Sequence, residues 1–183
     1  MIRSITQTIL KLILKPRGAW KELSRKEEKL EDFYNTFLYP LFGFITVTTF
    51  VGAMWIRSGG GVPFALRDVV VVLTSLFGGF HIGAYVLDEI YQKYVEMRDE
   101  RQIRLFVGYS SVVVYLLYLI MPLLPGMELL WLLIVYTFYL VKEGVIHFLK
   151  LPEDKQSSFV LISLALVVLL PIIISSLLGV VIK

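Results

Sequence analysis

Apolar residues are gathered into five long stretches, and polar or charged residues separate them. Each stretch holds about 20 predominantly apolar residues, which is the length of helix that crosses the hydrocarbon core of a bilayer. The predicted transmembrane helices are 35–56, 68–87, 103–122, 127–148 and 158–182. The pattern therefore predicts an all-α integral membrane bundle that forms a single domain.

Glycine and proline mark two of the connections. Residues 59–63 read as a flexible connector, and residues 122–126 as a tight one, because proline stops helices and glycine permits turns. The second connector is so short that the third and fourth helices should form an antiparallel hairpin. Pro40 and Pro171 are expected to kink the first and fifth helices.

Residues 1–34 form a cytoplasmic or interfacial segment that begins with an amphipathic helix. Basic residues recur along one side, and apolar residues (Ile2, Ile5, Ile9, Leu12 and Ile13) lie away from it. We expect this helix to lie in the membrane interface, with basic groups toward anionic headgroups at Arg3, Lys11, Lys15 and Arg17. Packing of the helix against the bundle is an alternative, and a cleaved signal peptide is a weaker one because no small-residue cleavage site follows.

The composition agrees with a membrane protein. Hydrophobic residues make up 57% of the 183 residues, whereas an ordinary soluble domain is about 45–50% apolar. A globule of this size could not bury the excess. The chain contains no cysteine, which excludes disulfides, thiolate metal sites and cysteine nucleophiles.

The basic residues favour one orientation. Fifteen of the eighteen Lys and Arg residues fall on the side of the amino-terminal segment, and three (Arg57, Arg67 and Lys183) fall on the other. Short loops rich in Lys and Arg remain in the cytoplasm. We therefore expect the amino terminus inside and the carboxy terminus outside, in a membrane that is most simply a prokaryotic cytoplasmic membrane.

This orientation is testable with reporter fusions placed after Arg101 and after Lys183. The two reporters should report opposite sides of the membrane, because an odd number of predicted spans separates the two points. Reporters on the same side would mean that the number of spans is wrong by an odd number.

Polar residues inside the predicted spans are candidates for a functional site, because ionisable groups in a membrane are costly and usually face the bundle interior. In the fourth helix a stripe at spacings of three and four contains Tyr136, Tyr139, Glu143 and His147. The second helix contributes His81, Tyr85 and Asp88. A structural role remains open for both groups: headgroup contacts for the stripe, and a locally satisfied histidine at position 81.

His81 and Glu143 lie at similar depths, within about 5 Å at 1.5 Å per residue. A contact between them would form a polar site between the second and fourth helices that could relay a proton or bind a cation. On the other side of the second helix a row of small residues, Ser75, Gly79 and Gly83, is expected to allow close helix packing, within the bundle or between subunits.

No catalytic motif is present. The chain lacks H-E-x-x-H, G-x-S-x-G and the phosphate loop with its lysine. We therefore expect no enzyme activity, no cofactor and no metal.

Two short elements resemble the Yip family, polytopic membrane proteins named for interaction with Ypt/Rab small GTPases. Pro16 followed by Trp20 is similar to the proline and tryptophan that precede the first helix in prokaryotic members. Gly108-Tyr109 is similar to the family's G-Y-x-x-P element, with Val112 in place of the proline. The resemblance implies five helices and an oligomer, and for the prokaryotic branch an unknown function.

The sequence thus favours a non-enzymatic membrane protein that acts through protein or lipid contacts. The expected partners are membrane lipids, a second copy of the chain and a cytoplasmic protein, with no nucleic acid. The alternative is a small-solute, ion or proton transporter or channel that uses the polar site between the second and fourth helices.

Overall fold

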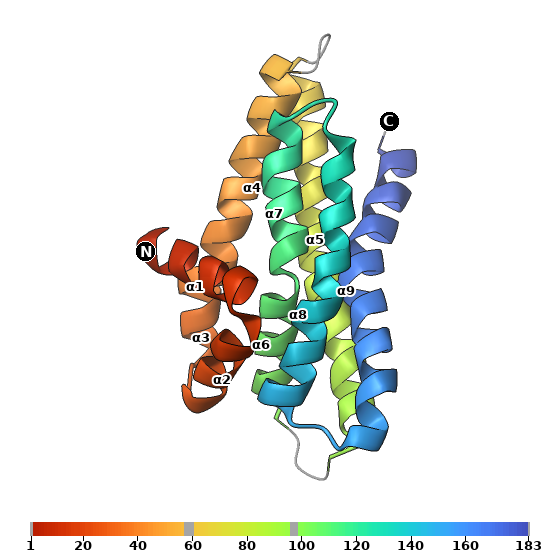
Figure 1. Ribbon diagram of the computed structural model, residues 1–183. Helices are drawn as coiled ribbons and strands as arrows, with labels where there is room; N and C mark the ends of the chain where they lie inside the picture. Colours follow the sequence, from red (N-terminus) through yellow and green to blue (C-terminus); the bar gives the residue numbers. More distant parts are fainter. Residues whose placement is uncertain (1, 57–60, 96–98, 183) are drawn as a thin grey trace.

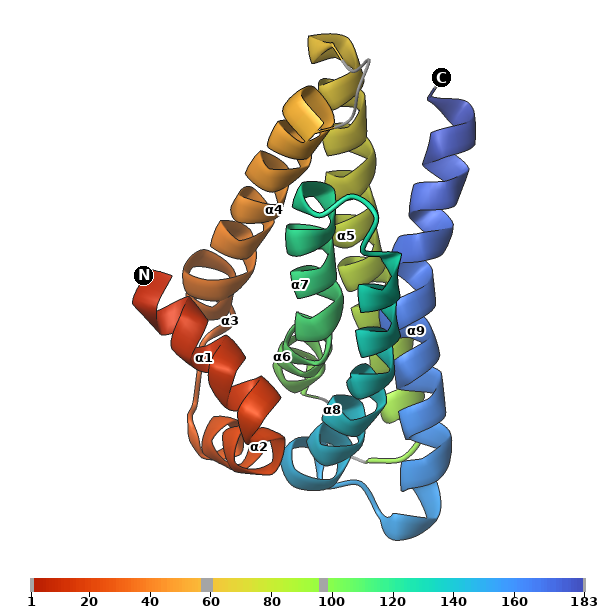
Figure 2. The same cartoon turned by 45° about the horizontal axis from the view of Figure 1, so that its top comes forward.

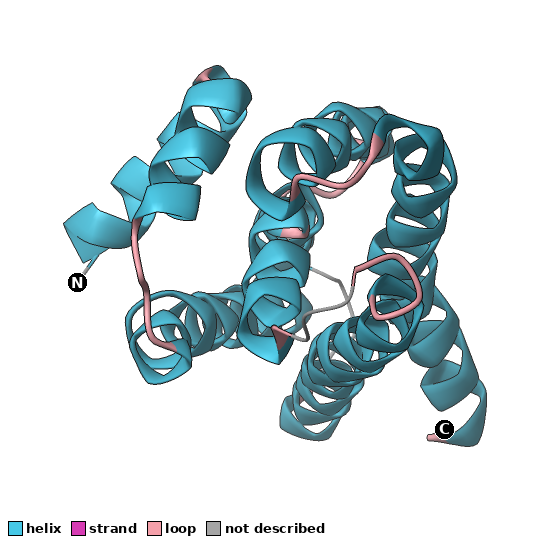
Figure 3. Ribbon diagram, turned by 90° about the horizontal axis from the view of Figure 1, so that it is seen from below, coloured by secondary structure: helices cyan, strands magenta, loops and turns pink. Residues whose placement is uncertain are grey.

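The computed structural model describes residues 2–56, 61–95 and 99–182, with the side chains of residues 2–4 and 56 left out. Of the residues singled out above, the Arg3 side chain, Gly59, Gly60, Arg57 and Lys183 lie outside the described part. Within it every element is a helix, as predicted (Figure 1; Figure 3 shows the same in a view from below).

Two short helices precede the bundle. Helix α1 spans Ile2–Leu14 and α2 spans Pro16–Arg25. Proline is well suited to the first turn of α2, where the missing amide hydrogen would have no helical partner. Figure 1 and Figure 2 show α1 lying across the outside of the bundle instead of along it.

The remaining elements run along the bundle. The first rod comprises α3 (Leu30–Phe33), η1 (Tyr34–Leu38), α4 (Tyr39–Val51) and η2 (Gly52–Ile56). It is followed by α5 (Val62–Tyr91), then by α6 (Glu100–Ser110), α7 (Val112–Ile120) and η3 (Met121–Leu123). The fourth rod comprises η4 (Glu128–Val135), α8 (Tyr136–Gly144) and η5 (Val145–Leu149). The fifth rod is α9 (Glu153–Val181).

These rods match the predicted spans. In the described residues four helices are long and apolar enough to cross a membrane: Leu30–Trp55, Val62–Tyr91, Glu128–Leu149 and Glu153–Val181. A fifth span results if the bent pair Glu100–Ser110 and Val112–Leu123 is counted as one. The first, second and fifth helices begin five or six residues earlier than predicted. The first turns of the first and fifth helices contain charged residues, which a hydropathy pattern leaves out, and the second helix begins inside the stretch 59–63 that was assigned to a connector.

The third predicted helix, 103–122, is broken rather than continuous. Its two halves meet at an angle of 41° beside Ser111. The Ser111 hydroxyl donates a hydrogen bond to the Val107 carbonyl at 2.7 Å, one turn back. Serine hydroxyls that bond to the preceding turn in this way often bend helices, which gives a local physical reason for the break.

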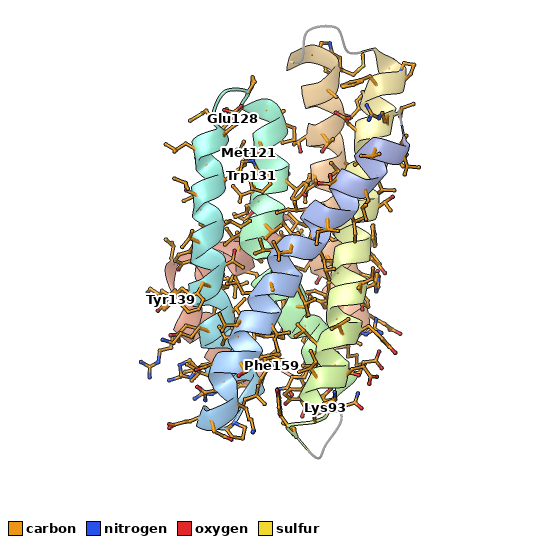
Figure 4. The ribbon with its side chains drawn as sticks, turned by 90° about the vertical axis from the view of Figure 1, so that its right-hand side faces the viewer. Lys93, Met121, Glu128, Trp131, Tyr139 and Phe159 are labelled. Atoms are coloured by element: carbon orange, nitrogen blue, oxygen red, sulfur yellow. The ribbon has the colours of Figure 1, made fainter. Side chains whose placement is uncertain are left out.

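The α5–α9 contact is the most extensive in the bundle. Figure 4 shows α9 lying against α5 along most of its length, with α8 on its other side. The small-residue row of α5 lies in this contact. A Cβ atom added at Gly79 would be 2.7 Å from Pro171 Cγ, and one at Gly83 would be 3.5 Å from a Leu170 methyl group.

The bundle has two chemically different ends. We call the end formed by α2, the start of α6 and the turn at 150–152 the charged end, at the bottom in Figure 1. The opposite end contains the hairpin turn at 123–127 and the last turn of α9. There Arg67 donates a hydrogen bond from Nη2 to the Gly179 carbonyl at 3.1 Å, and a second one from Nε to the Ile182 carbonyl.

Helix α1 packs its apolar side onto the bundle, the arrangement that the sequence left as an alternative. Ile5 and Leu12 are buried, whereas Leu10 and Leu14 are exposed. The Tyr136 hydroxyl donates to the Ile13 carbonyl at 2.6 Å and so ties the end of α1 to the fourth rod. The apolar side that would enter lipid in a free amphipathic helix is thus partly used inside the molecule.

Candidate functional site

Trp20 fixes the amino-terminal segment to the bundle at the charged end. Its side chain is fully buried, and its indole Nε1–H donates to the Leu140 carbonyl at 3.0 Å. Residue 144 is glycine because the ring needs the space: a Cβ there would lie 2.9 Å from Trp20 and 2.8 Å from Phe106. Helix α2 is thereby held against α8 and η5.

The other residues of the family resemblance meet the same segment. The Tyr109 ring stands edge-on to Trp20 with centroids 6.3 Å apart, and its hydroxyl donates to Glu28 Oε2 at 2.8 Å. A Cβ at Gly108 would lie 2.2 Å from the Phe33 ring. Pro16 is buried in the first turn of α2. The four residues of the family resemblance therefore lie where residues 15–33 dock onto α6 and α8: Pro16, Trp20, Gly108 and Tyr109.

Glu28 is a buried acid that the sequence analysis missed. It lies in the connection between α2 and α3, and Lys26 Nζ approaches its carboxylate to 3.3 Å. Arg101 also donates to the Glu28 backbone carbonyl at 3.1 Å. A buried carboxylate needs such partners. No periodic pattern surrounds position 28, so its burial could not be predicted from the sequence.

The last turns of the fourth rod place Glu143 and His147 together. The His147 Nε2 and Glu143 Oε2 atoms are 3.2 Å apart, and both side chains are mostly buried. Glu143 is thus paired one turn along its own helix. The charges of Arg17 and Lys21, on α2, also act on the imidazole.

A basic hollow opens beside this pair. It has a volume of about 420 Å³ and is lined by Lys21, Ser24 and Arg25 of α2 and by Ile146, His147 and Lys150 of the fourth rod. Among these described lining residues all charged side chains are basic or, for histidine, can become so. Docking of α2 by Trp20 brings residues together here that lie more than 100 positions apart in sequence.

An apolar groove adjoins the basic hollow. It lies between α8 and α9, has a volume of about 310 Å³ and shares Ile146 with the hollow. Its other lining residues are Phe138, Lys142, Gln156, Ser157, Val160 and Leu161. Charge, polarity and an apolar channel thus lie side by side at the charged end.

The contact between His81 and Glu143, which the sequence left open, is not formed. His81 is exposed on the outside of α5, where its ring lies 5.0 Å from Phe80 and 6.3 Å from Phe77. At about 100° per residue, position 81 is about 160° away from Gly79, which faces α9. The contact was considered because His81 and Glu143 lie at similar depths in the membrane. Depth says nothing about how each helix is rotated about its own axis.

The other candidate residues of α5 also diverge. Tyr85 is 68% exposed on the outside. Asp88 is buried and accepts a hydrogen bond from Gln92 Nε2 at 2.8 Å. In the fourth rod, Tyr136 bonds to α1 as described and Tyr139 is exposed on the outside of the bundle, as Figure 4 shows. Within the described residues no group of three His, Cys, Asp or Glu side chains could hold a metal ion.

The amino-terminal basic residues behave differently from one another. Lys11 forms an ion pair with Glu22 at 2.8 Å, with both side chains exposed. Lys15 and Arg17 are exposed. The small-residue row, by contrast, is internal: Ser75 is buried and its hydroxyl donates to the Val71 carbonyl at 2.6 Å.

Comparison with known proteins identifies the family of the chain. A family model described as Yip1 domain matches residues 10–176, which is nearly the whole chain. The family indicated by Pro16, Trp20, Gly108 and Tyr109 is therefore confirmed. Neither the curated proteins nor the solved structures gave a significant match.

Proposed function

We propose, on the premise that the chain belongs to the Yip1 domain family, that this integral membrane protein acts without catalysis by binding anionic lipid headgroups at its charged end. The observation that carries the proposal is the basic hollow formed by α2 and the end of the fourth rod. The hollow lies where apolar helix gives way to charged connections, which is the level of lipid headgroups when such a helix spans a bilayer.

Electrostatics support an anionic ligand. Lys21, Arg25 and Lys150 bring three permanent positive charges to the rim of one hollow. Lys and Arg clusters next to transmembrane helices attract anionic lipids, with about 1 kcal/mol for each basic group near the surface. Ser24 also lines the hollow, where its hydroxyl donates a hydrogen bond to the Lys21 carbonyl at 3.0 Å.

The adjoining groove favours a lipid over an acidic protein segment. A phospholipid carries a phosphate and apolar chains a few ångströms apart, and the hollow and groove offer a basic surface and an apolar channel that meet at Ile146. Lys142 also lines the groove and adds a positive charge to it. In the orientation favoured by the basic residues, this site faces the cytoplasmic leaflet.

The transporter hypothesis has less support. Its central pair was His81 with Glu143, and each residue has other neighbours: His81 is exposed beside Phe77 and Phe80, and Glu143 is mostly buried and paired with His147. A polar site between the second and fourth spans therefore has no framework in the described residues.

The test compares lipid binding by the detergent-purified protein and by charge-reversed variants, measured by native mass spectrometry. The wild type should bind phosphatidylglycerol in preference to phosphatidylcholine. The double variant Lys21→Glu, Arg25→Glu should bind phosphatidylglycerol at least about 30-fold more weakly, which corresponds to about 1 kcal/mol for each basic group.

The control is the double variant Lys29→Glu, Lys93→Glu, which makes the same change in net charge at the same end of the molecule but outside the hollow. It should keep most of the binding. If both double variants lost the same affinity for phosphatidylglycerol, binding would reflect general attraction to a basic surface. The proposed headgroup site would then have to be abandoned.

A further inference from the structure

A second cavity lies at the opposite end of the bundle, and the proposed function makes no use of it. Its volume is about 350 Å³, which is the size of a site for a small molecule. It is enclosed by η2, the start of α5, the end of α7 with η3, and η4. Figure 4 shows three of its residues, Met121, Glu128 and Trp131, at this end of the hairpin.

Two aromatic rings form a corner in this cavity. The rings of Tyr118 and Trp131 stand at 88° with their centroids 5.8 Å apart, and both residues line the cavity. An ammonium group placed over the face of either ring would be attracted to it, because the electron-rich face of an aromatic ring attracts a cation. Tryptophan gives the strongest attraction of this kind.

The charge of the lining has the matching sign. Among the described lining residues the charged ones are Asp68, which already has a polar partner, and Glu128, and both are acidic. The carboxylate that the cavity offers to a ligand is therefore that of Glu128, which is exposed and lies beside the two aromatic residues of the lining.

The walls also offer a polar group and a rigid side. The Thr49 hydroxyl is buried, lines the cavity and has no hydrogen-bond partner in the protein. Leaving such a group unpaired costs free energy. A ligand hydroxyl or amine that formed a hydrogen bond with it would therefore bind more tightly. Close approach of η2 to η3 holds this side in place: a Cβ at Gly52 would lie 2.3 Å from the Pro122 carbonyl oxygen.

We propose that this cavity binds an organic cation, namely a primary or quaternary ammonium group. A small metal ion suits it less, because magnesium and calcium require six or more oxygen ligands in a regular shell. An ammonium group with apolar substituents suits aromatic rings and the Glu128 carboxylate together. The same group occurs as a free solute and as the end of a phospholipid headgroup, so the experiment includes both sources.

The first arm uses choline chloride as the probe. The full-length protein is placed in nanodiscs of phosphatidylglycerol alone, and binding of radiolabelled choline is measured by equilibrium dialysis. Choline should bind saturably, whereas its neutral isostere, in which a tert-butyl group replaces the trimethylammonium group, should not compete. Competition by the isostere at equal concentration would mean that the cavity is only an apolar space and would overturn the proposal.

Two variants locate the binding. Trp131→Leu and Glu128→Gln should each weaken choline binding by about tenfold, because each removes one part of the cation's surroundings. The matched controls are Trp55→Leu and Glu153→Gln, which change an exposed tryptophan and an exposed acid outside the cavity lining. Choline binding that both cavity variants retain in full would overturn the proposal. Glu128 is exposed, so Glu128→Gln should fold normally. Choline binding can therefore be tested in this variant even if Trp131→Leu does not fold.

The second arm identifies the source of the ammonium group. Thermal stability of the protein is compared in nanodiscs that contain phosphatidylglycerol alone or with added phosphatidylethanolamine or phosphatidylcholine. Stabilisation by these lipids that Glu128→Gln abolishes would support the proposal and assign the ligand to a headgroup, even without binding of free choline. Absence of both choline binding and Glu128-dependent stabilisation by these lipids would overturn it. Because the basic hollow lies at the other end, the variants Lys21→Glu and Arg25→Glu should leave both readouts unchanged.

Discussion

Replacing Trp20 with alanine should release residues 15–29 from the bundle and lower the melting temperature of the protein in detergent. The change removes a fully buried ring that contacts Phe106, Tyr109 and Phe148, and with it the hydrogen bond to the Leu140 carbonyl. Substitutions of buried aromatic residues by alanine cost about 3–5 kcal/mol. Because Trp20 is the largest buried side chain of α2, we expect much of this loss to appear as local opening of the segment.

Limited digestion with trypsin measures that opening directly, since residues 15–29 are rich in lysine and arginine. Cleavage within this segment should become faster in Trp20→Ala than in the wild type. Trp20→Phe keeps most of the packing and loses the hydrogen bond, at about 1 kcal/mol, and should fall between the two. Trp55→Ala is the matched control, because Trp55 is 72% exposed. Equal cleavage rates in Trp20→Ala and Trp55→Ala would contradict the role of Trp20 as the anchor.

The same variant should also disturb the proposed lipid site. Lys21 and Arg25 reach the hollow only because α2 is held beside His147 and Lys150. A released α2 keeps its charges but no longer presents them at one place. The proposed binding surface therefore depends on the docking of α2 by Trp20. Trp20 is also one of the residues by which the sequence resembles the family.

The spans were predictable because hydropathy along the chain needs no knowledge of neighbours. A stretch of about 20 apolar residues has to be a helix across the bilayer, whatever it packs against. The helical class and the number of stretches follow from hydropathy, and the hairpin at 122–126 follows from the short connector with its prolines and glycine. The break at Ser111 does not follow, because it depends on one hydroxyl bonding to the preceding turn.

The site was less predictable because it depends on how helices are rotated about their axes. His81 and Glu143 have similar depths, yet the close contact of Gly79 with α9 turns His81 to the outside of α5. The small-residue row was visible in the sequence. If that row is taken to face a neighbouring helix, position 81 on the opposite side of α5 has to face outward. The hollow itself was hidden, since it joins α2 to residues 146–150 through the docking of Trp20.

The contact of Gly79 with Pro171 gives the second large expected effect. An added methyl group at position 79 would lie 2.7 Å from Pro171 Cγ and 3.0 Å from its Cδ. A proline ring is bonded to its own backbone and cannot rotate away, so α9 would have to move as a whole. Overpacking of this kind costs about 1–3 kcal/mol, more than the gain of up to about 1 kcal/mol from replacing a helical glycine with alanine.

Gly79→Ala should therefore lower the melting temperature in detergent, and Gly79→Leu should lower it further or prevent recovery of a single species in size-exclusion chromatography. Two other glycines supply the controls for helix propensity. Gly83→Ala places its methyl group at an ordinary contact distance of 3.5 Å from Leu170, and Gly43→Ala meets nothing within 4 Å. Both should be neutral or slightly stabilising. If all three alanine variants melted alike, the α5–α9 contact would tolerate separation at Pro171, and the outward orientation of His81 would lose its physical cause.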